Sequence, residues 1–261
     1  METEKFNLDT NHPPTLFVGR NYIFLPETPS TNATLKSLYA KSQLPEGTVV
    51  ITAYQTEGRG QAGTTWDSEK DNNIMLSVLL YPKFIHVADQ FLISKTIALA
   101  ILDLIKKMLP DLPVRIKWPN DILVSGKKIC GILIENGLKS EAIEYCICGI
   151  GINVNQLFED ANRTSLKTIT GAEYNLEYLE KQLFSHIEAR YLQLRSKRDA
   201  ISKDYLEALF GLFETNTFQN LNTEKPFEGK ICGINPDGRL MIETAEGIKV
   251  FGIKEINLMK R

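Results

Sequence analysis

Apolar positions along this chain follow two different periods. Short apolar runs rich in β-branched residues predict buried strands at 22–25, 48–53, 74–80, 114–118, 122–124, 129–135 and 144–155. Apolar residues at helical spacing predict helices through 35–39, over about 87–108 and over about 176–213. A chain of 261 residues with these elements is long enough for one sizeable core and a small additional domain.

The pattern changes near the C-terminus. Residues 218–261 contain short β-like runs, separated by the hairpin signals Asn235-Pro236-Asp237-Gly238 and Glu246-Gly247. We therefore expect two domains, 1–217 and 218–261, the second a small all-β domain packed on the first. The polar residues 1–20, which include Pro13-Pro14, are expected to form a loose lead-in.

A glycine-rich stretch, Gly58-Arg59-Gly60-Gln61-Ala62-Gly63, follows the strand at 48–53 and leads to Trp66. Glycines let backbone N–H groups approach an anion closely, and Arg59 can form a bidentate contact with a carboxylate or phosphate. Trp66 adds a flat aromatic face. The stretch predicts a lid over an anionic, partly aromatic ligand; a mobile surface loop without a ligand is the alternative.

The same stretch has the G-x-G-x-x-G spacing of dinucleotide-binding proteins. That fingerprint requires a helix to begin at once, because the helix N-terminus binds the pyrophosphate. Residues 64–73 are polar and aperiodic instead, so we reject a dinucleotide site of this kind.

Composition excludes several classes of function. Thirty Lys and Arg residues against 32 Asp and Glu residues leave no global basic field for nucleic acid. No apolar segment is long enough for a membrane helix, and the N-terminus lacks a signal-peptide core. The three histidines are isolated, which argues against a histidine metal site. The four cysteines, at 130, 146, 148 and 232, are expected to be buried thiols in a reducing cytoplasm.

Polar residues collect where predicted strands end. Ser30-Thr31-Asn32 stands before the first helix, where residue type alone favours a helix cap; the hydroxyl groups could also bind a small polar ligand, and one group can do both. The turns 117–121 and 127–128 carry lysines that we expect to converge with Arg59 on one anion. Two glycines inside the strand 144–155 indicate a bulge or a close approach of ligand or backbone, and Asn153 after them could read a nucleobase or ribose.

In these segments the chain resembles the biotin protein ligases over nearly its full length. The resemblance rests on 30–32, 58–66, 117–122, 128–135 and 149–153. It implies an α+β fold, a mixed sheet flanked by helices as in class II tRNA synthetases and lipoate ligases, followed by an SH3-like β domain at 218–261. Only 29 residues precede Ser30, so the N-terminal DNA-binding domain of regulatory members is not expected, and neither is DNA binding.

The resemblance also implies an activity. Such enzymes use ATP and Mg²⁺ to convert biotin to biotinyl-5′-AMP, and then transfer biotin to a lysine of a carrier. The carrier is the biotin carboxyl carrier protein or domain of acetyl-CoA carboxylase or another biotin-dependent carboxylase. We expect a cytoplasmic enzyme without membrane contact, and a homodimer is one assembly left open.

Site residues follow from the resemblance, position by position. Ser30, Thr31 and Gln55 would hold the ureido ring beside Gly149. Arg59 and Lys128 would be the catalytic residues, meeting the carboxylate of biotin and the α-phosphate. The remaining matched positions are implied on the nucleotide side or within the same motifs: Trp66 and Asn153 framing adenine, Lys117 and Asn120 along the nucleotide, Asp121 near the phosphates, Asn73 beside magnesium, and Asn32, Gly58, Gln61 and Gly131.

One departure stands out, because Gln61 occupies a position where many relatives have a second arginine. The base that deprotonates the acceptor lysine is left open between the adenylate phosphate and Asp121. Lipoate–protein ligase is an alternative function, and a non-catalytic vitamin- or nucleotide-binding protein is another. Every matched motif ends before Asn155, so the sequence assigns the C-terminal domain a surface for a partner and no part of the ligand site.

Overall fold

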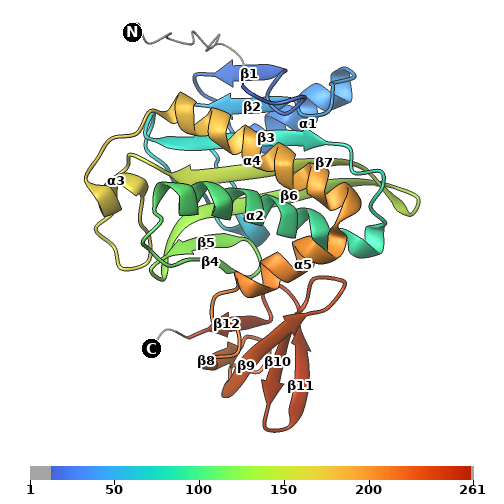
Figure 1. Ribbon diagram of the computed structural model, residues 1–261, viewed down its shortest axis with the longest axis vertical. Coiled ribbons are helices and arrows are strands. Elements are labelled where there is room, and N and C mark those ends of the chain that lie inside the picture. The colour runs from blue at the N-terminus through green and yellow to red at the C-terminus, as the bar shows by residue number, and fades with distance from the viewer. Residues whose placement is uncertain (1–12, 260–261) are drawn as a thin grey trace, which may run out of the picture.

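A seven-stranded mixed sheet forms the larger body of the computed structural model, which describes residues 13–259 (Figure 1). The strand order is β1-β2-β3-β7-β6-β5-β4, with β1 parallel to β2 and the other neighbours antiparallel. The strands are β1 (Tyr22–Leu25), β2 (Val49–Thr52), β3 (Asn73–Leu80), β4 (Val114–Lys117), β5 (Asp121–Val124), β6 (Lys127–Lys139) and β7 (Ala142–Asn153). The predicted mixed sheet is confirmed.

Helices cover both faces of this sheet. They are α1 (Thr31–Lys41), α2 (Phe91–Met108), α3 (Leu166–Thr170), α4 (Leu176–Ser196) and α5 (Arg198–Glu207), with short 3₁₀ turns at Gln61–Gly63 and Val87–Asp89. Side chains of a strand alternate between faces, so Val49 and Ile51 join the core under α2 and α4, whereas Val50 joins the cluster under α1 (Figure 1). The main core therefore lies on the face away from α1.

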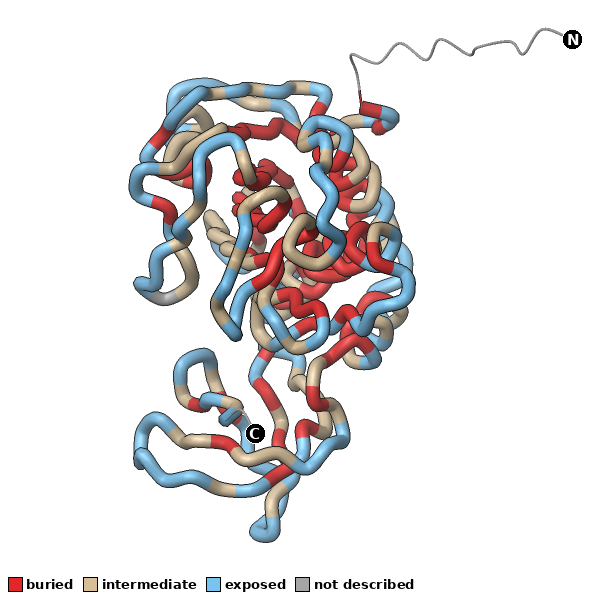
Figure 2. Tube along the Cα trace, turned by 90° about the vertical axis from the view of Figure 1, so that its left-hand side faces the viewer, coloured by how far each residue is buried: buried red, intermediate tan, exposed pale blue. Residues whose placement is uncertain are grey.

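The C-terminal segment forms a second, five-stranded antiparallel sheet of order β11-β10-β9-β8-β12. Its strands are β8 (Thr215–Asn220), β9 (Pro226–Ile234), β10 (Leu240–Thr244), β11 (Gly247–Phe251) and β12 (Ile256–Leu258). Stacked rings of Phe218, Phe227 and Phe251, with centroids 5.5–5.7 Å apart, form its small core. Figure 2 shows how few of its residues are buried compared with the larger body.

Three local predictions need correction. The long C-terminal helical region is two helices, because Lys197 leaves helical geometry between α4 and α5. The polar stretch 156–175 contains α3, which the sequence pattern did not reveal. Residues 15–18 are not a loose lead-in: Val18 is fully buried, and the Glu188 carboxylate of α4 accepts hydrogen bonds from the backbone N–H groups of 16, 17 and 18. Residues 1–12 of that lead-in lie outside the described part.

Two expectations from composition can be compared with the described residues. The four cysteines carry free thiols, and all but the half-buried Cys232 are buried. None of the described helices is long and apolar enough to cross a membrane.

Candidate active site

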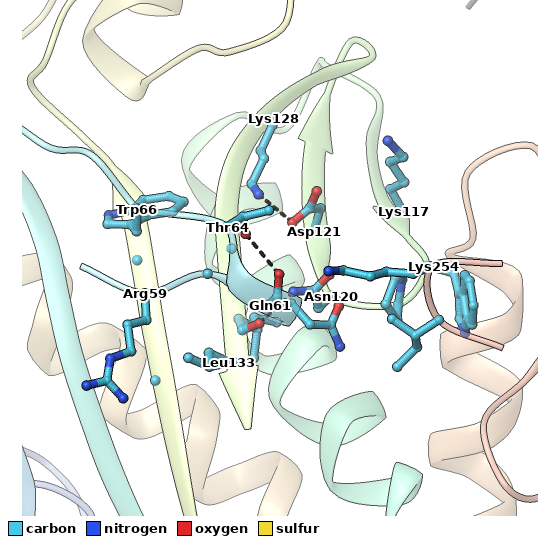
Figure 3. A pocket seen from close by; sticks show the side chains of 18 of the residues that line it. Arg59, Gln61, Thr64, Trp66, Lys117, Asn120, Asp121, Lys128, Leu133 and Lys254 are labelled. Carbon is cyan, nitrogen blue, oxygen red and sulfur yellow. Dashed lines mark hydrogen bonds and ion pairs between the residues drawn. The ribbon is translucent and has the colours of Figure 1, made fainter. Parts of the chain in front are cut away.

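A cavity of about 330 Å³ is lined by residues of both sheets (Figure 3). Such a volume is at the lower end of the range for small-molecule sites. The structure brings together most of the sequence-predicted site residues in its lining: Ser30, Thr31, Asn32, Gln55, Arg59, Gln61, Trp66, Lys117, Asn120, Asp121, Lys128, Gly131 and Gly149.

One wall is a hydrogen-bond network at the start of α1. The backbone N–H and the hydroxyl of Thr31 both donate to Gln55 Oε1, at 2.9 and 3.2 Å. The hydroxyl of Ser77 lies 2.8 Å from that of Thr31. Ser30 occupies the N-cap position, yet within the described part of the chain its side chain makes no capping hydrogen bond, so a role as helix cap alone is not supported. Ser77 was missed, although it is the one polar residue in the run 74–80.

Asn32 extends the network into the sheet. Its Oδ1 accepts from Ser77 at 2.6 Å, and its Nδ2 donates to Glu135 Oε2 at 2.8 Å. A Cβ at position 149 would lie 2.4 Å from Asn32 Oδ1, so Gly149 is required for this close approach. The side chain of Asn32 therefore fills the space directly beside Gly149, and Gly149 itself still lines the cavity. Glu135 was part of a recognised motif but had no assigned role.

The glycine-rich stretch is a small hairpin that ends in a 3₁₀ turn. Gly60 N donates to Thr64 O at 2.7 Å, and Trp66 N donates to Gly58 O at 2.9 Å. A Cβ at Gly58 would lie 2.2 Å from Trp66 O, so the close pairing of the hairpin strands requires glycine at this position. The η1 turn spans three residues, and no α-helix follows it before β3, in agreement with the rejection of a dinucleotide fingerprint.

Trp66 lies against a platform made by two paired glycines. Gly131 on β6 stands opposite Gly151 on β7, and a Cβ at either position would lie within 3.0 Å of the Trp66 ring. Trp66 Nε1 is buried without a hydrogen-bond partner among the described residues. The ammonium group of Lys128 lies 5.6 Å from the ring centroid, within cation–π distance.

A β-bulge directs Lys128 into the cavity. Leu123 of β5 pairs with Lys128 and Ile122 pairs with Cys130, so Ile129 has no partner across the ladder. As a result Ile129 and Cys130 are both buried while Lys128 faces the site. The Lys128 ammonium group forms an ion pair with Asp121 at 2.7 Å (Figure 3).

The Lys117–Asp121 turn is fixed by hydrogen bonds to two different parts of the protein. Asn120 Nδ2 donates to Ile132 O at 2.7 Å, and Ile132 N donates back to Asn120 O at 3.0 Å. Trp118 Nε1 donates to Gly238 O at 2.9 Å, which ties this turn to the C-terminal sheet. The turn that carries Lys117 and Asp121 is thus fixed from two directions.

Three predicted residues lie outside the cavity lining. Gly58 shapes the hairpin behind it. The buried Asn73 side chain donates to Gln156 and accepts from Val154 N, and its magnesium-side position stays a prediction. Asn153 is 1% exposed and donates to Thr164 O, while its Oδ1 has no partner among the described residues.

Cys130, close to Lys128, is a potential nucleophile that can be excluded. Burial raises the pKa of its thiol, an effect that outweighs the opposing influence of Lys128. The sulfur is therefore protonated near neutral pH, and a thiol is a poor nucleophile compared with a thiolate.

The C-terminal domain contributes to the lining, contrary to the sequence expectation. Residues from four of its segments line the cavity: Phe218, Leu221, Ile231, Leu240, Ile253, Lys254, Ile256, Asn257 and Leu258. No sequence motif predicts these lining residues, because short polar and apolar runs in a β domain do not indicate which part of the protein they will pack against.

Comparisons with known proteins agree with this geometry. Residues 24–153 match the model of the biotin/lipoate A/B protein ligase family. The chain is 31% identical over 252 residues to the bifunctional ligase/repressor BirA of Bacillus spizizenii, covering 92% of this chain and 75% of that protein. It is 33% identical over 183 residues to the biotin–[acetyl-CoA-carboxylase] ligase of Mycobacterium tuberculosis, covering 69% and 67%.

A solved structure supports the same assignment. The biotin protein ligase of Aquifex aeolicus in complex with biotin and ATP superimposes with a TM-score of 0.75 at 27% identity. The match covers 93% of this chain and all of that one. By sequence and by fold, this chain belongs to the biotin/lipoate A/B protein ligase family, as a biotin protein ligase.

Proposed function

We propose that this protein activates biotin with ATP and transfers it to a lysine of a biotin carboxyl carrier domain. The observation that carries the proposal is the meeting of two features in one cavity. The network around Thr31 and Gln55 offers amide and hydroxyl groups to a neutral polar ring, and Arg59, Lys117 and Lys128 offer positive charge to phosphates.

On the biotin side, Gln55 is oriented by Thr31, whose two donors occupy the Gln55 carbonyl oxygen. The Nε2 amide of Gln55 is then the group that donates to a ligand. A ureido ring combines a carbonyl acceptor with two N–H donors, which the hydroxyl of Ser30 and the amide of Gln55 complement. A site built around such polar groups discriminates strongly against a ligand that lacks their partners, and lipoate has no ureido group.

On the nucleotide side, two buried polar atoms have no hydrogen-bond partner within residues 13–259: Trp66 Nε1 and Asn153 Oδ1. Unpaired buried polar atoms are rare and call for an explanation. Gly149, Gly151 and Asn153 lie on one face of β7 because strand residues two apart point the same way. An adenine bound beside the Trp66 ring would provide a ring acceptor for the indole N–H. Asn153 lies outside the cavity lining, so it would meet the nucleotide only after the Trp66 ring had moved away from Gly151.

In the first step, a carboxylate oxygen of biotin attacks the α-phosphorus of ATP while the bond to the bridging oxygen of the β-phosphate breaks. Pyrophosphate leaves, and biotinyl-5′-AMP is formed. Two anions must come together, so cations placed in advance lower the barrier. Lys128 is suited to this role, because the bulge aims it and Asp121 holds it in position.

In the second step, the acceptor amine attacks the acyl carbonyl of the adenylate and AMP leaves with the shared oxygen. Water competes with the amine, so the hairpin 58–66 would protect the adenylate by closing over it. The proton lost by the amine has two candidate acceptors, the adenylate phosphate and Asp121.

Magnesium fits this site through its usual preference for phosphate oxygens supplemented by one or two carboxylates. Asp121 is the only carboxylate among the described lining residues, and the described residues contain no group of three or more acidic, histidine or cysteine side chains that could hold the ion alone. Asp121 would therefore help to hold a magnesium ion that arrives with ATP, where it would neutralise phosphate charge. The ATP requirement and the free thiols support a cytoplasmic location.

The decisive experiment is biotin-dependent exchange between ATP and labelled pyrophosphate, with lipoate in a parallel reaction. We expect exchange in the reaction with biotin and none in the reaction with lipoate. A biotin carboxyl carrier domain added to the biotin reaction should then become biotinylated. Exchange with lipoate would favour a lipoate–protein ligase. Binding of biotin without exchange would indicate a non-catalytic binding protein.

A further inference from the structure

The turn between β11 and β12 brings a lysine of the C-terminal domain to the active site. Lys254 lines the same cavity as Gln61 and Asn120. Figure 3 shows its side chain extending from the C-terminal domain toward Asn120. None of the motifs that identify the family includes this position.

The turn has a fixed shape. Gly252 N donates to Glu255 Oε2 at 2.7 Å, and Glu255 N donates to Gly252 O at 3.2 Å. Leu221 N donates to Glu255 O at 2.9 Å, which joins the turn to the end of β8. The backbone that carries Lys254 is therefore held by local and long-range hydrogen bonds.

The backbone at Lys254 is left-handed, with φ of 65°. Glycine adopts this conformation readily, whereas a residue with a Cβ is strained in it. A lysine here is thus not the residue that the turn itself prefers. Five other non-glycine residues of the described chain also have a positive φ, so the reason for a lysine here has to come from its place on the cavity lining.

The charge balance of the cavity supplies a reason. Among the described lining residues, Arg59, Lys117, Lys128 and Lys254 are basic and Asp121 is acidic. Asp121 is paired with Lys128, which offsets part of the charge of that lysine. Gln61 leaves the hairpin with Arg59 as its single cation. Lys254 restores a positive charge near Gln61, but from the opposite domain.

We infer that Lys254 binds the polyphosphate of ATP, so that the C-terminal domain completes the nucleotide site. The inference rests on the proposed function, because it assigns a role within the same reaction. Lys254 lies beside Asn120, on the nucleotide side of the cavity, and this position favours binding to the phosphates over binding to the ureido ring of biotin. A flexible lysine on a rigid turn can follow the phosphates as pyrophosphate separates.

The test compares Lys254→Ala, Lys254→Gly and Lys254→Arg with the wild type, and Lys249→Ala is the control. Lys249 lies on β11 of the same domain, pairs with Glu246 and does not line the cavity. We expect Lys254→Ala to weaken ATP binding, measured by calorimetry, by about tenfold. The KM for ATP in pyrophosphate exchange should rise by a similar factor, the KM for biotin should stay within about twofold, and arginine should restore ATP affinity.

Lys254→Gly separates this role from a structural one. Glycine suits the left-handed turn, so this variant should unfold at the same temperature as the wild type or higher while losing ATP affinity like the alanine variant. Unchanged ATP binding in both variants would overturn the inference. So would equal losses of ATP and biotin affinity, which would indicate a disturbed fold. Absence of exchange in the wild type would contradict the proposed function, whereas calorimetry with ATP would still test Lys254.

Discussion

Trp118 Nε1 donates a hydrogen bond to the carbonyl of Gly238 at 2.9 Å, across the boundary between the two sheets. Gly238 lies in the β9–β10 turn with φ of 90°, and a Cβ there would lie 2.4 Å from the ring of Phe91 at the start of α2. Phe91 packs edge-on against Tyr205, whose hydroxyl donates to Pro119 O at 3.3 Å. The active-site turn and the C-terminal domain are thus joined by one small cluster.

Gly238→Ala is expected to destabilise this junction. The added methyl group clashes with Phe91 and strains a left-handed backbone, each effect costing on the order of 1–3 kcal/mol. Pyrophosphate exchange should fall because the turn carrying Lys117 and Asp121 loses its anchor. Thermal unfolding and exchange rates check both effects. Gly233→Ala is the control, since its nearest neighbour would be Met241 Sδ at 3.6 Å; a wild-type unfolding temperature for Gly238→Ala would contradict the prediction.

Lys128→Ala is expected to reduce adenylation strongly while the fold persists. The backbone N–H and carbonyl of Lys128 bond to Asn162 O and Thr164 N, and alanine retains both bonds. Loss of a preorganised cation should reduce exchange by roughly 10²–10³-fold. Lys127→Ala, at the adjacent exposed position outside the cavity lining, should be nearly silent. Exchange near the wild-type rate in Lys128→Ala would remove this residue from the mechanism.

Gln61→Arg is expected to slow the release of biotinyl-5′-AMP. Gln61 lines the cavity at the end of the hairpin, so an arginine there can reach an anionic ligand. A hydrogen bond to a charged group contributes roughly 1.5–3 kcal/mol, which corresponds to about a tenfold or larger decrease in the dissociation rate. Rapid-mixing measurements of adenylate release test this, and an unchanged rate would count against it.

The hairpin 58–66 is expected to open readily when the site holds no ligand. Its closure depends on few backbone bonds, and residues 63–65 are exposed, so little buried surface opposes opening. Trypsin should therefore cut after the exposed Arg59. Biotin with ATP and Mg²⁺ should suppress this cut while exposed sites such as Lys203 remain sensitive. Equal cutting at Arg59 with and without ligands would refute a lid.

Glu180 on α4 should make stability depend on pH. Burial raises the pKa of its carboxyl from 4.5 to about 7; the hydrogen bond from Tyr22 opposes the rise, Glu177 adds to it, and Lys181 opposes it. Between these pH values the folded protein binds more protons than the unfolded chain. The contribution of Glu180 to the free energy of unfolding is therefore largest below pH 4.5, and it decreases as pH rises toward 7.

Glu180→Gln removes this dependence. The variant should match the wild type near pH 4 and exceed it at pH 8 by at most roughly 3 kcal/mol in the free energy of unfolding. Denaturant unfolding across this pH range measures the difference. Glu177→Gln, which changes an exposed carboxylate on the same helix, should leave most of the slope in place. An identical pH profile for Glu180→Gln and the wild type would show that this carboxyl is not the source.

The sequence by itself determined most strands, the long helix α2 and the family. These depend on local signals: the period of apolar residues, turn residues such as Asp237-Gly238, and motifs whose members are close in the chain. The rejected dinucleotide fingerprint belongs to the same group, because the absence of a following helix can be read locally.

Only the tertiary structure decided which side chains of these elements contact one another and which face the site. The bulge at Ile129 inverts the usual alternation and turns Lys128 toward the cavity, and strand pairing, not composition, sets that register. Gly149 and Gly151 appeared to admit a ligand, yet Asn32 and Trp66 occupy the space beside them. Lys254 is distant in sequence from every motif, and only the docking of the second sheet brings its charge to the site. Contacts between remote segments depend on packing, which no single stretch of sequence encodes.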